Sequence, residues 1–157
     1  MLKIISVCVV SLVLTACGRA RDAKVHPLMT EHYDAFMADC AKYNADCKTD
    51  NLTIDVVDVL PAGAPHKGVG YCYLEPSLRG LKRHIWILTS TANEESMTPA
   101  RAVFYHEAGH CMVGLLGLEH VNSKPDVMNS NPAHMKAVMA TWEEQVKAMF
   151  SRIPKKP

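Results

Sequence analysis

Two histidines and a glutamate near the middle of the chain have the spacing of a metal-binding helix. They belong to the segment His106-Glu107-Ala108-Gly109-His110. Residues four apart on an α-helix lie one turn apart on the same face, so both imidazole rings can reach one zinc ion. Glu107 lies between them, where it can take a proton from a water on that ion. The spacing therefore predicts a catalytic zinc site, which also needs a third ligand and one open position.

The nearest candidate for the third ligand is His120, ten positions after His110. An unbroken helix would carry His120 about 15 Å away, too far to share the ion. The chain must therefore turn back, and Gly114 and Gly117 can make that turn because glycine accepts the left-handed conformation at a helix end. Other residues stay open as third ligands: Asp126, His134, Glu143 and Glu144. The remaining histidines are scattered, and we interpret them as surface or core groups: His26, His32, His66 and His84.

Residues 106–128 resemble the zinc motif of the metzincin endopeptidases. That family carries H-E-x-x-H-x-x-G-x-x-H, followed by a methionine turn. The stretch Leu116-Gly117-Leu118-Glu119-His120 is similar to the end of this motif in the matrix-metalloproteinase branch. Six residues then separate His120 from Val127-Met128, as in the approach of that branch to its methionine turn.

The resemblance implies a zinc metallopeptidase with one Zn²⁺ ion and a peptide or protein substrate. His106, His110 and His120 would bind the zinc, Glu107 would be the general base, and Met128 would lie beneath the metal. Hydrolysis of the peptide bond would use a zinc-bound water activated by the glutamate.

The chain departs from the metzincin pattern between the second and third histidines. The family has six positions from one to the other, and this chain has ten. Either the motif helix runs one turn longer before Gly117, or it ends at Gly114 and residues 115–119 bulge. In metzincins the substrate pairs with an edge strand just before the motif helix, and the resemblance assigns that role to residues 81–89.

Two other functions are compatible with the same residues. An envelope lipoprotein could keep a zinc site for structure or for binding a partner, and such a site would close the fourth position with a protein ligand. A zinc hydrolase could also act on cell-wall peptides rather than proteins. The open fourth position distinguishes a hydrolase from a structural site, whereas the substrate class leaves no mark in the sequence.

The N-terminal segment is typical of a bacterial lipoprotein signal. Lys3 precedes an apolar run over residues 4–14, and Leu14-Thr15-Ala16-Cys17 resembles the lipobox. The run is shorter than the ~20 residues of a membrane-spanning helix. We predict a signal peptide at 1–16, a lipidated Cys17 with a tether at 17–28, and a zinc metallopeptidase-like domain at 29–157. The expected location is the bacterial cell envelope, with the lipid holding the chain to a membrane.

Four of the six cysteines would stay unmodified in the mature chain: Cys40, Cys47, Cys72 and Cys111. Export to an oxidising compartment makes two disulfides the expectation. Of the three possible pairings, we favour Cys40–Cys47 with Cys72–Cys111, because it joins cysteines that follow one another along the chain. Four buried free thiols remain the alternative. The formal net charge of +1 implies no polyanionic partner and excludes nucleic acid as an expected ligand.

The hydrophobic pattern predicts one α+β domain around the motif. Residues 30–43 have helical spacing, with Thr30 as N-cap, and three strands are expected at 51–60, 69–74 and 81–89. Thr98-Pro99 should open a long motif helix that runs to about Leu116, and Asn131-Pro132 the last helix. We expect a small metzincin-like domain with a short three-stranded sheet, a long zinc-motif helix, a methionine turn and a C-terminal helix. One stripe of the last helix is apolar: Met135, Val138, Met139, Trp142, Val146 and Met149.

Overall fold

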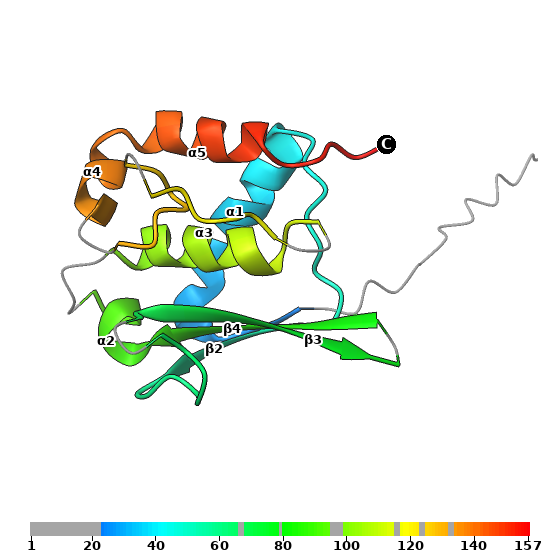
Figure 1. Cartoon of the computed structure of the whole chain (residues 1–157), viewed down its shortest axis with the longest axis vertical. Coiled ribbons are helices and arrows are strands. Elements are labelled where there is room, and N and C mark those ends of the chain that lie inside the picture. Colours follow the sequence, from blue (N-terminus) through cyan, green and yellow to red (C-terminus); the bar gives the residue numbers. More distant parts are fainter. Residues whose placement is uncertain are drawn as a thin grey trace, which may run out of the picture.

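The computed structural model describes residues 23–65, 68–78, 80–94, 99–114, 117–122, 125–131 and 134–157. The predicted signal peptide and Cys17 lie outside these ranges, as do the expected helix boundaries at Thr98, Leu116 and Pro132. Helices cover one face of a β-sheet, and the motif helix lies between the sheet and the C-terminal helices (Figure 1). Within the described ranges, no helix has the length and apolar character needed to span a membrane.

The sheet has four strands rather than the predicted three: β1 (Lys24–Val25), β2 (Leu52–Val57), β3 (Gly70–Ser77) and β4 (Gly80–Leu88). Their order is β1-β2-β4-β3, with β1, β2 and β4 parallel and β3 antiparallel to β4. The additional strand, β1, comes from residues assigned to the tether. A two-residue strand has no alternating pattern, because a period of two needs several residues to become visible.

The strand order corrects the expected role of residues 81–89. Strand β4 pairs with β2 on one side and with β3 on the other, so it lies inside the sheet. The edge strands are β1 and β3, and β3 pairs with β4 up to Ser77 and Gly80, where Gly80, the first residue of β4, has φ +104°. The order of the strands along the chain does not reveal this arrangement. Strands β2 and β4 pair directly with each other, so β3, which lies between them in the sequence, pairs with β4 at the edge of the sheet.

The motif helix, α3 (Ala100–Cys111), is shorter than predicted. Its last carbonyls are taken by groups from elsewhere in the fold. The Arg83 side chain donates to the Cys111 carbonyl at 2.7 Å, and the Lys48 backbone N–H donates to the Met112 carbonyl at 2.6 Å. These contacts satisfy the end of the helix near Cys111, so it does not continue to about Leu116 as expected.

The other helices are a 3-10 turn η1 (Pro27–Met29), α1 (Thr30–Lys42), a short α2 (Thr89–Ala92), α4 (Met135–Ala140) and α5 (Trp142–Ser151). Met29, rather than Thr30, is the N-cap of α1 because η1 leads directly into that helix. The predicted single C-terminal helix breaks at Thr141, whose φ of −125° and ψ of 37° lie outside the helical region.

The core fills the space between the sheet and the helices. Ile85 and Ile87 of β4 are buried in this core, and Phe36 of α1 contacts Phe104 and Phe150 through their rings. Nearly every residue of α3 is buried, which explains why this helix lacks a polar face.

The predicted disulfide pairing is confirmed. One bond joins Cys40 at the end of α1 to Cys47, and the other joins Cys72 of the edge strand β3 to Cys111 at the end of α3. The second disulfide fastens the edge strand to the helix that carries the histidine motif.

Candidate metal centre

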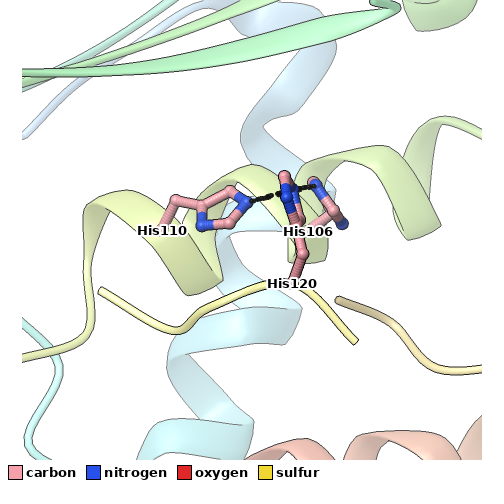
Figure 2. Close-up of side chains that lie close together, drawn as sticks. All are labelled: His106, His110 and His120. Atoms are coloured by element: carbon pink, nitrogen blue, oxygen red, sulfur yellow. Dashed lines mark hydrogen bonds between the residues drawn. The ribbon is translucent and has the colours of Figure 1, made fainter. Parts of the chain in front are cut away.

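Three histidine nitrogens converge at the surface of α3. The Nε2 atoms of His106 and His110 are 3.2 Å apart, and His120 Nε2 lies 3.0 Å from that of His110 and 3.2 Å from that of His106 (Figure 2). Two imidazoles come from successive turns of α3, and the third comes from the loop that follows. The structure thus brings together the three histidines that the sequence proposed as ligands, and this group could hold a metal ion.

The loop reaches the motif through the two glycines expected to turn the chain. Gly114 has φ +57° and Gly117 has φ +72°, both in the left-handed region. A side chain on Gly117 would also overlap the His110 backbone. After this turn the Leu118 N–H donates to the Gly109 carbonyl at 2.9 Å, which lays the loop along α3. The helix ends at Cys111, before both of the expected end points at Gly114 and Gly117, and residues 115–116 lie outside the described ranges.

Backbone carbonyls orient the two helix histidines. His106 Nδ1 lies 2.8 Å from the Val127 carbonyl oxygen, and His110 Nδ1 lies 2.7 Å from that of Leu118. A carbonyl only accepts, so each Nδ1 carries the hydrogen. Burial lowers the pKa of His106 to about 4 and also lowers the pKa of His110. Both rings are therefore neutral at pH 7, and both Nε2 atoms present bare lone pairs.

The geometry fits a cation placed between these nitrogens. With no hydrogen on either Nε2, the 3.2 Å approach of His106 and His110 is not a hydrogen bond, although it is drawn as a dashed line in Figure 2. Two facing lone pairs repel each other unless a positive charge lies between them. Donors 2.0–2.1 Å from one tetrahedral ion are about 3.3–3.4 Å apart, close to the 3.0–3.2 Å that separates these atoms.

None of the rival third ligands joins this group. Among the described residues, the potential ligands whose donor atoms lie within 4.8 Å of one another are His106, His110 and His120. Asp126 is instead paired with Arg152 at 2.7 Å, and Glu143 lies 3.8 Å from Lys42 in solvent. His134 and Glu144 are also absent from the group.

Glu107 is buried beside the histidines, and its carboxylate accepts a hydrogen bond from the Cys72 backbone N–H of β3. Burial raises the pKa of Glu107 to about 8, and this hydrogen bond partly opposes the rise. A divalent cation held by the histidines would lower the pKa again, because a nearby opposite charge favours the ionised carboxylate. Ion binding would therefore convert Glu107 into a base at neutral pH.

Met128 lies against the motif helix on the side of Gly109. A Cβ atom on Gly109 would be 2.5 Å from Met128 Sδ and 3.1 Å from its Cε, so the packing needs a glycine at this position. Val127, the preceding residue, supplies the carbonyl that orients His106. The Met128 segment thus packs against the motif helix and orients His106, whereas a place for Met128 beneath a bound metal stays a prediction.

A cleft of about 610 Å³ opens over the histidines and Glu107. The edge strand β3 forms one wall with Gly70, Tyr71 and Cys72, and residues 129–131 with Met135 contribute to its lining. Sequence reasoning missed this wall, because nothing in residues 70–72 carries catalytic chemistry. Only the strand order places them beside the motif helix.

Comparisons with known proteins identify no relative. No family model matches the chain, and neither the curated proteins nor the solved structures that were searched contain a match. The similarity to metzincins therefore rests on the motif residues.

Gly70 is expected to be essential for the placement of Glu107. A Cβ at this position would lie 2.8 Å from Glu107 Cγ and 2.9 Å from Val103 Cγ1. Gly70→Ala should displace the carboxylate, and if Glu107 acts as the general base that the motif predicts, the rate of hydrolysis should fall by about 10–100-fold, because small displacements of a catalytic group have effects of this size. Zinc affinity should stay unchanged, since no ligand moves.

Kinetics and zinc titration of Gly70→Ala check this prediction. Gly80→Ala is the control, because it adds a methyl group to the same hairpin, where the nearest atom is Asn51 Nδ2 at 3.9 Å. Its φ of +104° makes it the more strained substitution, so a loss of activity caused by general destabilisation would be at least as large in the control.

Proposed function

We propose that this chain is a zinc-dependent peptidase, held to a membrane of the bacterial envelope by a lipid on Cys17. The observation that carries the proposal is the convergence of three Nε2 atoms beside a buried glutamate in an open cleft. Two of these nitrogens belong to neutral rings whose hydrogens are held elsewhere, so the donor set suits a metal rather than a hydrogen-bonded core cluster.

Zinc is the metal that this donor set favours. Three imidazole nitrogens with one further position are typical of catalytic zinc, whereas magnesium and calcium prefer oxygen ligands. A structural zinc site would add a fourth protein ligand, and the described residues bring no fourth His, Cys, Asp or Glu into the group. His120 is exposed, which leaves the site accessible from the cleft. These observations favour a hydrolase over the alternative of a non-catalytic envelope lipoprotein.

The proposed reaction assigns one proton-transfer role to Glu107. When bound, the zinc would supply an activated water and polarise the scissile carbonyl. The Glu107 carboxylate takes the proton of the attacking water and then passes it to the nitrogen of the leaving amine. The N–H of Cys72 and the close packing of Gly70 hold the carboxylate in place during both transfers.

The edge strand β3 is the proposed docking site for the substrate. It lies at the end of the sheet and lines the cleft with residues 70–72. An extended peptide can add to such an edge through main-chain hydrogen bonds, and its side chains then face the cleft. This assignment replaces the expectation that residues 81–89 would bind the substrate.

Metal content and hydrolysis measured on the same preparation test the proposed function. We expect one zinc ion per chain and cleavage within a mixed peptide library. A strong chelator should abolish the cleavage, and zinc should restore it. A protein that binds one zinc ion but cleaves no peptide would favour the non-catalytic alternative. A protein that binds no metal would contradict both functions.

The membrane anchor gives an independent prediction. Cys17→Ser should remove the site of lipid attachment, move the protein out of the membrane fraction and abolish labelling with fatty acid. Cys8→Ser is the matched control, because it makes the same change within the predicted signal peptide, nine positions earlier. Unchanged labelling of Cys17→Ser would show that the lipobox interpretation is wrong. The peptidase proposal would be unaffected.

A further inference from the structure

We propose that the ion pair between Arg152 and Asp126 is a positioning device for the metal site, through which the C-terminal end of the chain sets zinc affinity. Arg152 Nη2 lies 2.7 Å from Asp126 Oδ1. The Asp126 side chain is 3% exposed and that of Arg152 is 32% exposed, so the carboxylate is the buried partner. This inference rests on the proposed metal site. It concerns residues that the motif does not include.

Asp126 holds the turn that carries the support for His106. The same Oδ1 atom accepts the Met128 backbone N–H at 2.8 Å, and the Asp126 carbonyl accepts the Asn129 N–H at 3.0 Å. Asp126 therefore closes residues 126–129, here called the methionine turn, through two hydrogen bonds. Its side chain accepts one of them and its backbone carbonyl accepts the other. Between these contacts, the Val127 carbonyl accepts the Nδ1 hydrogen of His106 at 2.8 Å.

The methionine turn also reaches the other two histidines. The Met128 carbonyl accepts the Val121 N–H at 2.9 Å, which fixes the residue that follows His120. The Met128 side chain packs against Gly109, which precedes His110 on α3. A shift of this turn would disturb all three histidines, because the turn contacts the surroundings of each of them.

Arg152 is what neutralises the buried carboxylate at the centre of this network. It comes from the end of α5, 26 positions from Asp126 along the chain. Removing one member of a buried ion pair leaves the other charged in a nonpolar environment, and the local structure rearranges to expose it. The turn would move with Asp126, and the Val127 carbonyl would no longer be fixed opposite His106. Groups that orient a metal-binding histidine in this way typically contribute 10–100-fold to metal affinity.

Zinc affinity of the Arg152→Gln variant, measured by competition with a chelator, tests the proposal without any catalytic assay. Affinity should fall about 10–100-fold. Lys147→Gln is the matched control, because it removes one positive charge from an exposed position of the same helix. Asp126→Asn should produce a similar fall, and the double variant should fall no further than the single variants, since both disrupt one interaction.

Cobalt substitution separates positioning from a general loss of stability. The visible spectrum of bound Co²⁺ reports the ligand geometry, and it should change in Arg152→Gln but not in Lys147→Gln. The proposal would be overturned if the zinc affinity of Arg152→Gln lay within twofold of that of Lys147→Gln. If Arg152→Gln does not fold, the zinc affinity of Asp126→Asn is compared with the control in the same way. A wild-type chain that binds no zinc would instead contradict the proposed function itself.

Discussion

Glu107→Gln is expected to keep one zinc ion per chain and to lose hydrolysis by about 10²–10⁴-fold, the usual contribution of a general base. The amide has nearly the same shape as the carboxylate, so it fits the space beside Gly70 and can still accept from the Cys72 N–H. It cannot take a proton from water. Because the histidines are unchanged, zinc content and the folded structure should match the wild type.

Peptide cleavage and metal analysis of Glu107→Gln check this result. Glu119→Gln is the control, because Glu119 is exposed and directly precedes His120 in the loop. It should leave hydrolysis close to the wild-type rate. Turnover by Glu107→Gln near that of the control would remove Glu107 from the mechanism, even if the metal site is real.

His120→Ala is expected to lower zinc affinity more than 100-fold, beyond the 10–100-fold typical of residues that only orient a ligand. The two imidazoles left on α3 hold zinc weakly, and the described residues bring no other donor into the group. Hydrolysis should disappear with the metal. The fold should survive, because His120 is exposed and lies in a loop outside the core.

Metal titration of His120→Ala beside two controls gives a clear decision. His134→Ala and Glu143→Ala remove rival ligands named from the sequence, and both should bind zinc within about twofold of the wild type. Retained zinc in His120→Ala, with loss in either control, would show that the third ligand comes from the C-terminal helices. Glu107 and the two histidines of α3 would then keep their roles in a different zinc site.

Local chemistry in this chain could be inferred from the sequence alone. The four-residue spacing of His106 and His110 determines that both rings share one helix face, because the helical repeat is independent of the rest of the fold. The turn toward His120 was equally visible, because Gly114 and Gly117 are residues that adopt positive φ at little cost. The predicted disulfides join cysteines that follow one another along the chain, and the structure has the same two bonds.

Elements beyond the motif were predicted less well where distant groups act on them. The motif helix ends at Cys111 because Arg83 and Lys48 take its last carbonyls, and both residues are remote in sequence. The C-terminal helix was expected as one piece from its apolar stripe, but Thr141 interrupts it. Periodicity reports which face of a segment is buried. It does not report where a tertiary hydrogen bond ends a helix.

The sequence by itself determined which residues could bind a metal and which one could move a proton. The tertiary structure decided what surrounds them. Only the strand order places β3 beside α3, so that Gly70 and Cys72 constrain Glu107. Only the packing of α5 brings Arg152 to Asp126, which holds the turn that orients His106. Ligand chemistry belongs to single side chains and their local spacing, whereas orientation depends on groups that only the fold brings together from distant parts of the chain.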